Sequence, residues 1–95
     1  GLVVVPDGHE PCRPLPAQVA VLTASHPVPD RRGIEAAERA LRLAAGLSPG
    51  DRLIALVSGG GSALLPLPVE GVSLDDKRSV TRALLGCGAT IAEIN

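Results

Sequence analysis

The sequence has no Phe, Tyr, Trp or Met among its 95 residues, and it has only two cysteines. Aromatic side chains normally supply much of the area that a core buries, so this core must be built from smaller aliphatic side chains. A chain of this length buries only roughly 60–65% of the surface that its unfolded form exposes, so such a core is marginal by itself. Together with the missing initiator Met at Gly1, this predicts one incomplete domain over residues 1–95, a piece of a longer polypeptide.

The sequence also lacks long apolar runs and a strong charge of either sign. No run approaches the roughly 18–20 residues that cross a membrane, and no signal peptide opens the chain. The formal net charge is −1, and the eight arginines and one lysine are scattered, which argues against nucleic-acid binding. Cys12 and Cys87 lack the spacing of a disulfide framework, so a cytoplasmic protein with reduced thiols is expected.

Three short apolar segments predict β-strands. Leu2–Val5 is a β-branched run that Pro6 ends, and Val19–Thr23 is a second candidate. Leu53–Val57 is apolar without polar alternation, a pattern typical of a strand buried on both faces of a parallel sheet. The order of strands and helices predicts an α/β fold, part of a Rossmann-like parallel-sheet layer domain with flanking helices.

The clearest helical pattern runs from about Arg31 to Gly46, with Asp30 as the N-cap. Two Glu–Arg pairs at four-residue spacing, Glu35–Arg39 and Glu38–Arg42, are expected on one of its faces. Another face is apolar and is expected to be buried. That face consists of Ile34, Ala37, Leu41, Ala44 and Ala45.

Two capping-box patterns predict further helices. Ser73 and Asp76 mark the start of one, which the glycines at positions 86 and 88 end. Its apolar stripe contains Val80, Leu84 and Cys87. Thr90 and Glu93 have the same spacing, so Ile91–Asn95 resembles the first turn of another helix.

The strongest local signal is the glycine-rich segment SGGGSA directly after the third predicted strand. Consecutive glycines allow backbone conformations that other residues rarely adopt, and they leave no side chains to block a ligand. The exposed N–H groups of such a turn suit phosphate or carboxylate oxygens. We therefore predict a phosphate- or substrate-binding loop, which consists of Ser58, Gly59, Gly60, Gly61 and Ser62. A tight turn with a purely structural role is the alternative.

Three named motifs fail at this loop. A dinucleotide-binding G-x-G-x-x-G pattern and a nucleophile elbow G-x-S-x-G both need a glycine where Leu64 stands. A Walker loop needs Gly-Lys-Ser/Thr, and no lysine is near. His9 and His26 nevertheless keep a serine hydrolase open as an alternative.

The proline-rich loop SHPVPD, residues 25–30, holds a second group of polar side chains. Its Ser25, His26 and Asp30 are candidates for a rigid binding loop. The alternative is that His26 packs locally and Asp30 only caps the helix. His9, Glu10 and Cys12, together with Asp7, superficially resemble metal ligands. A structural zinc site needs four ligands in paired spacings, and only His9 and Cys12 have a usable offset, so no metal site is predicted.

The order of these motifs resembles one family closely. SHPVPD, then a helix, then LVSGGGSALLPLP, then VSLDDKRSVTRALLGCGATIAEIN is similar to the N-terminal domain of the D-glycerate 2-kinase family. Members of that family carry a MOFRL domain at the C-terminus, and some are labelled hydroxypyruvate reductase. The resemblance covers nearly the whole chain and is strongest from Ser25 to Asn95.

The resemblance implies transfer of a phosphoryl group from ATP, with Mg²⁺, to the 2-hydroxyl of D-glycerate. It implies two α/β domains with the active site in the cleft between them. The family's phosphate- and substrate-binding loop corresponds to residues 58–62, and its SHPxPD loop corresponds to Ser25, His26, Pro27, Pro29 and Asp30. The resemblance does not say whether the glycines meet ATP phosphates or glycerate.

Residues 1–95 lack several parts of the family pattern that the kinase activity needs. By this resemblance, we expect the family's active-site lysine upstream of Gly1, its N-x-x-R-K-H segment from Asn95 onward and its second domain outside residues 1–95. We therefore expect the 95-residue piece alone to lack kinase activity. A hydroxypyruvate reductase that uses NAD(P)H and a non-catalytic anion-binding module remain the alternative functions.

Overall fold

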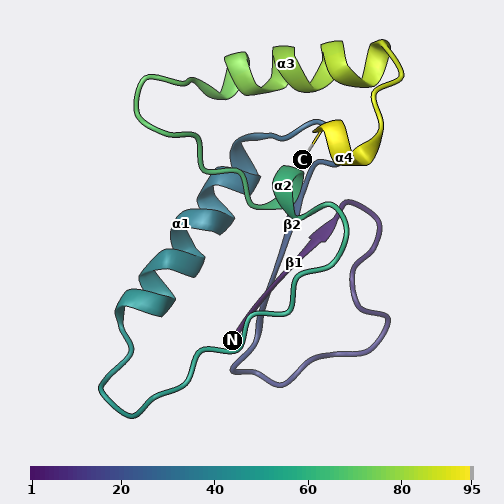
Figure 1. Cartoon of the computed structure of the whole chain (residues 1–95). Helices are drawn as coiled ribbons and strands as arrows, with labels where there is room; N and C mark the ends of the chain where they lie inside the picture. Colours follow the sequence, from purple (N-terminus) through teal and green to yellow (C-terminus); the bar gives the residue numbers. More distant parts are fainter. Residues whose placement is uncertain (95) are drawn as a thin grey trace.

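The computed structural model describes residues 1–94, without the side chain at position 91, and its centre is a pair of parallel strands (Figure 1). Strand β1 spans Leu2–Pro6 and strand β2 spans Ala20–Ala24. The register pairs Leu2 with Ala20 at one end and Pro6 with Ala24 at the other. A proline-containing loop joins the strands, because Pro11, Pro14 and Pro16 cannot continue a helix or a central strand.

Four helices follow the strands: α1 (Arg31–Ala45), α2 (Gly61–Leu64), α3 (Leu74–Gly86) and α4 (Ile91–Ile94). Helix α1 packs beside β2, and the short helix α2 contacts α1 and both strands. Helix α3 crosses above them near α4, at the top of Figure 1. Parallel strands together with packed helices confirm the predicted α/β class. The residue at position 95, expected in the last helical turn, lies outside the described residues.

The predicted helix starts are confirmed by their caps. The Asp30 carboxylate accepts a hydrogen bond from the Gly33 N–H at 3.1 Å at the start of α1. Ser73 and Asp76 form the complete capping box of α3, with reciprocal bonds of 3.0 and 2.9 Å. The Glu93 carboxylate accepts from the Thr90 N–H at 2.8 Å before α4.

One of the two ion pairs predicted on α1 is confirmed, and the other is wrong. Glu38 and Arg42 approach to 3.8 Å as expected. Glu35 instead lies 3.5 Å from Arg31, one turn toward the N-terminus, and not beside Arg39. Both pairs are exposed, so each adds little to stability.

The core consists of small side chains where α1, α2 and the end of β2 meet. Its buried residues are Ala24, Pro29, Gly33, Ala36, Ala37, Ala63, Leu64 and Pro66. The predicted buried face of α1 is therefore partly wrong, since Leu41 is 55% exposed while Gly33 and Ala36 are buried. Small residues bury here because they let α1 approach its neighbours closely.

Gly33 makes the closest of these approaches. A Cβ placed on Gly33 would lie 2.7 Å from Cδ of Pro66 and 3.2 Å from the carbonyl oxygen of Ala63. Pro66 is fully buried, so its ring has little room to move. Only glycine allows α1 to lie this close to the segment that follows the glycine-rich loop.

The third predicted strand, Leu53–Val57, is wrong as a hydrogen-bonded strand in this structure. The segment is irregular, and it runs along β1 toward α2 (Figure 1). A cavity of about 570 Å³ lies between the segment and β1. Ile54, Leu56 and Val57 are 79%, 93% and 82% exposed, because no layer formed by residues 1–94 covers them. A strand buried on both faces needs both a hydrogen-bonded neighbour and covering layers.

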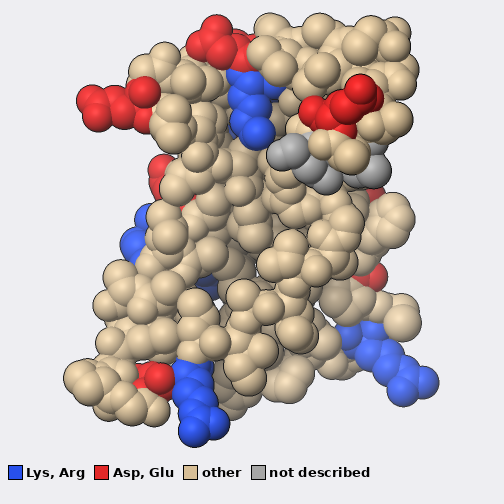
Figure 2. Space-filling view, viewed as in Figure 1, with Lys and Arg blue, Asp and Glu red and all other residues tan. Residues whose placement is uncertain are grey.

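The apolar stripe predicted for α3 is also exposed in part. No residue of α3 is buried, and Val80 is 58% exposed. On the face shown in Figure 2, charged groups are scattered and most of the surface is uncharged. No helix within residues 1–94 has the length and apolar character needed to span a membrane.

We expect Gly33→Ala to destabilise the domain. The methyl group would displace the Pro66 ring, and such overpacking costs about 1–3 kcal/mol, which exceeds the gain in helix propensity. The control is Gly86→Ala, because a Cβ there meets no atom within 4 Å. Urea unfolding of the two variants should separate them, and equal stabilities would contradict the close contact at Gly33.

Candidate functional site

The two loops singled out in the sequence meet at the carboxyl end of the sheet. The SHPVPD loop begins directly after β2, and the glycine-rich loop leads into α2. A Cβ placed on Gly60 would lie 2.8 Å from both Cδ2 and Nε2 of His26. The His26 ring therefore lies directly against the backbone of Gly60. The two loops thus form one candidate binding site.

Gly60 has the backbone conformation that the glycine-rich sequence predicts. Its φ of 86° is in the left-handed region, and it is the N-cap of α2. The Gly60 carbonyl accepts hydrogen bonds from the N–H groups of Ala63 and Leu64, each at 3.0 Å. The N–H groups of Gly61 and Ser62 precede these bonds at the open start of α2, where they can donate to a ligand.

A cavity of about 540 Å³ joins the two loops to α3. Three predicted site residues line it: His26, Gly60 and Ser62. The helical wall comes from α3 and includes Lys77, Thr81 and Leu84. The cavity therefore combines a histidine, a hydroxyl, a lysine and open backbone with a largely apolar wall.

The other predicted site residues lie elsewhere. Ser58, Gly59 and Gly61 line the separate cavity between β1 and residues 53–57. Asp30 caps α1, and the Ser25 N–H supports the Asp30 carboxylate. The structure thus splits the predicted glycine-rich loop between two cavities, and it assigns Asp30 a structural contact.

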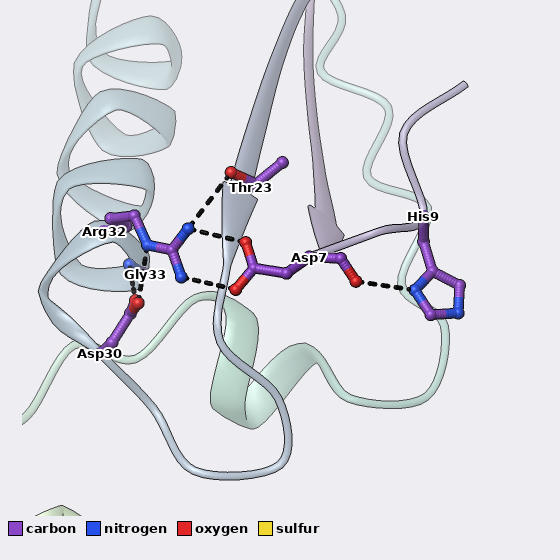
Figure 3. A network of polar contacts seen from close by, with 6 residues as sticks. All are labelled: Asp7, His9, Thr23, Asp30, Arg32 and Gly33. Carbon is purple, nitrogen blue, oxygen red and sulfur yellow. Dashed lines mark hydrogen bonds and ion pairs between the residues drawn. The ribbon is translucent and has the colours of Figure 1, made fainter. Parts of the chain in front are cut away.

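A charged network fixes the SHPVPD loop to the strands (Figure 3). Arg32 donates from both terminal nitrogens to the two carboxylate oxygens of Asp7, each at 2.7 Å. Its Nε donates to Asp30, also at 2.7 Å, and one terminal nitrogen lies 3.5 Å from the Thr23 hydroxyl. Arg32 therefore ties together the ends of both strands and the start of α1.

The network lowers the pKa of both carboxyl groups. The Arg32 hydrogen bonds lower the pKa of Asp7. Partial burial acts to raise the pKa of Asp30, but hydrogen bonds from Arg32 and from the backbone of Gly33 and Ser25 outweigh it. The same two aspartates raise the pKa of Arg32 further. All three groups are thus ionised at neutral pH.

Three residues were not predicted from the sequence: Asp7 and Arg32, which form the charged network, and Lys77, which lines the cavity. Asp7 follows β1 directly, and the SHPVPD loop follows β2. Because parallel strands end at the same edge of a sheet, that spacing could have placed Asp7 beside the loop. Arg32 and Lys77 carry no comparable signal, because nothing local shows which direction they face.

The side chains that superficially resemble metal ligands form no metal-binding cluster within residues 1–94. The His9 ring Nδ1 lies 3.1 Å from the Asp7 carbonyl oxygen, and Cys12 is an exposed free thiol. Over residues 1–94, no group of three or more His, Cys, Asp or Glu side chains is placed to hold a metal ion.

These features define an α/β domain with a candidate anion-binding site at the carboxyl end of its parallel strands. A family model described as a domain of unknown function, DUF4147, matches residues 1–95. The chain belongs to this DUF4147 family.

Similar proteins carry two different names. A protein from Agrobacterium vitis, provisionally named hydroxypyruvate reductase, is 49% identical over 96 residues, which are 100% of this chain and 21% of that protein. The D-glycerate 2-kinase of Thermotoga maritima is 48% identical over 75 residues, which are 79% of this chain and 18% of that protein. These matches confirm the family resemblance found in the sequence.

A solved structure has the same fold. The crystal structure of glycerate kinase from Thermotoga maritima superposes with a TM-score of 0.79 at 42% sequence identity. The match covers 99% of this chain and 22% of that chain. This chain therefore spans about a fifth of the length of the relatives that it matches.

We expect Arg32→Met to destabilise the protein in a pH-dependent way. The pKa values of Asp7 and Asp30 are lowered in the folded state, so their contribution to stability is present above the unfolded pKa, about 3.9. It is lost as the pH falls through the folded pKa values. The melting temperature of Arg32→Met should thus lie well below that of the unsubstituted protein at pH 7 and approach it near pH 3.

Arg39→Met is the matched control. Arg39 lies on the same helix and forms no ion pair with an acidic side chain of residues 1–94. Its loss should change the melting temperature little at either pH. A deficit of Arg32→Met that is the same at pH 7 and pH 3 would contradict the role given to the aspartates.

Proposed function

We propose that this chain is part of the N-terminal domain of a two-domain glycerate 2-kinase. The reaction transfers the γ-phosphoryl group of ATP to the 2-hydroxyl of D-glycerate. The hydroxyl oxygen forms a bond to the γ-phosphorus and loses its proton, and ADP leaves with the electrons of the broken phosphorus–oxygen bond. The products are 2-phosphoglycerate and ADP. In this proposal the rest of the protein closes the active site over the cavity between the two loops.

One observation carries the proposal: the glycine-rich loop and the SHPVPD loop face the same cavity. The similarity to proteins named D-glycerate 2-kinase and glycerate kinase includes both loops and the fold that brings them together. Phosphoryl transfer depends mainly on positioning and on stabilising negative charge. Open N–H groups, the Ser62 hydroxyl and the His26 ring can do both for an anionic ligand. The proposed phosphate- or substrate-binding loop is residues 58–62, which enters this cavity through Gly60 and Ser62.

ATP and Mg²⁺ are the proposed co-substrate and metal. In phosphoryl-transfer enzymes Mg²⁺ is usually held by one or two carboxylates together with the phosphates. The acidic residue of this cavity, Asp76, accepts two hydrogen bonds from Ser73 at 2.9 and 2.6 Å on one oxygen. The described residues therefore do not fit a Mg²⁺ site, and we assign no residue of this chain to the metal.

We also propose a cytoplasmic location. Cys12 and Cys87 are free thiols, as expected for a reducing compartment.

Hydroxypyruvate reduction is the second candidate function. It is favoured by two relatives from Agrobacterium vitis, 49% and 47% identical to this chain, which are provisionally named for that activity. A reductase needs a nicotinamide site, and Leu64 occupies the position of the last glycine of a dinucleotide-binding loop. Such a site would therefore have to lie elsewhere in the protein.

The decisive experiment compares both activities in the full-length protein that contains this chain. We expect ADP and 2-phosphoglycerate to form from ATP and D-glycerate with Mg²⁺ present. We expect no oxidation of NADH or NADPH with hydroxypyruvate. The reverse pattern would overturn the kinase in favour of the reductase.

Gly60→Ala tests whether this site serves that activity. The substitution adds a Cβ in the left-handed region and displaces His26, so kinase kcat/KM should fall about tenfold or more. The control is Gly50→Ala, because Gly50 has a φ of 100° but no atom within 4 Å of an added Cβ. It introduces similar backbone strain far from the loops. An equal fall in kcat/KM in the two variants would show that backbone strain alone matters. Unchanged kcat/KM in Gly60→Ala would contradict a role of the loop in the activity.

A further inference from the structure

The lysine of this chain lines the cavity that the two loops share. Helix α3 contributes one continuous face to that cavity, made by Lys77, Val80, Thr81 and Leu84 at three- and four-residue spacing. The opposite wall includes His26, Gly60 and Ser62. Lys77 is half-buried, which sets it apart from the exposed arginines nearby such as Arg82.

No acidic side chain within residues 1–94 forms an ion pair with Lys77. Asp76 is its neighbour and also lines the cavity, but its Oδ2 accepts hydrogen bonds from the Ser73 N–H at 2.9 Å and from the Ser73 hydroxyl at 2.6 Å. Asp76 thus caps α3 and does not pair with the lysine. The ammonium group has donors to offer to a ligand.

The residues that line the cavity around Lys77 favour one kind of anionic ligand over another. They are largely apolar and include Pro27, Pro29, Ala63, Pro68 and Val72. The walls are open to solvent in part, since Val72 and Val80 are 44% and 58% exposed, but their side chains offer no hydrogen-bond donor to an anion. A charge that enters the cavity without a partner loses part of its hydration, which makes a highly charged ligand costly. A single lysine therefore matches a group with one negative charge better than it matches a triphosphate.

We propose that Lys77 binds the carboxylate of the hydroxy-acid substrate, while Ser62 and His26 face the hydroxyl-bearing end of the same molecule. This inference rests on the proposed kinase function, and it answers which ligand occupies the cavity. The phosphates of ATP then bind outside it, at groups that the described residues do not supply.

The test uses steady-state kinetics of the full-length protein with Lys77→Met, Lys77→Arg and Arg82→Met. Loss of a charged hydrogen bond should raise the KM for D-glycerate about tenfold or more in Lys77→Met, with the KM for ATP nearly unchanged. Lys77→Arg keeps the charge and should recover most of the affinity. Arg82→Met removes a charge from α3 outside the cavity and should behave like the unsubstituted protein.

Two kinetic results would overturn the proposal. A KM for D-glycerate that is unchanged in Lys77→Met would show that the lysine does not hold the carboxylate. A rise confined to the KM for ATP would show that it serves phosphate instead. Thermal melting of each variant identifies a loss that comes from unfolding, in which case the milder Lys77→Gln is compared with Lys77→Arg.

Calorimetric titration with D-glycerate, without ATP, separates this proposal from the proposed kinase. Binding that weakens in Lys77→Met supports the lysine's role even if the full-length protein transfers no phosphate. Binding that is equal in both proteins, or absent from the unsubstituted protein, overturns that role. If the full-length Lys77→Met variant phosphorylates D-glycerate with normal kinetics, the proposed kinase function stands and the proposed role of Lys77 is wrong.

Discussion

The packing of Gly33 against Pro66 and the Ala63 carbonyl is the contact on which the rest of the structure depends. Gly33 lies in the first turn of α1, just after the SHPVPD loop, and Pro66 follows α2, just after the glycine-rich loop. Because no side chain separates them, the two loops come close enough for the His26 ring to lie against Gly60. Arg32, the neighbour of Gly33, adds the charged link to Asp7 and Asp30. A core without aromatic residues can position a site in this way, since its small side chains allow short distances between elements.

Much of this arrangement was predictable from local sequence. Asp30 and Ser73 mark helix starts because their side chains accept hydrogen bonds from the first free N–H groups. At the start of α4 the Glu93 carboxylate accepts hydrogen bonds from the N–H and the hydroxyl of Thr90. None of these local bonds needs a tertiary contact. The valine-rich run and Pro6 similarly mark the extent of β1. Gly60 could be placed in a left-handed turn from the run of glycines alone. Three of the predicted site residues, His26, Gly60 and Ser62, line one cavity, and their loops were recognised by composition and by resemblance to a known family. Their binding role stays a prediction.

The failures have a common physical origin in contacts between distant parts of the chain. Leu53–Val57 has the composition of a buried strand, yet neither a hydrogen-bonded neighbour nor a covering layer is supplied by the described residues. The buried face of α1 follows from which side meets Pro66, and periodicity alone cannot give that side. Lys77 was not predicted as a site residue, because a charged side chain near a helix start is usually solvated. Only the packing of α3 beside the two loops shows that it faces the cavity.

The most direct test of a single substrate site formed by the two loops is the crystal structure of the full-length protein with D-glycerate bound. We expect the ligand between His26, Gly60 and Ser62, with its carboxylate within hydrogen-bond distance of Nζ of Lys77. The His26 ring should still lie against the Gly60 backbone. D-glycerate bound away from this cavity, or the two loops held apart in the complex, would contradict a shared site.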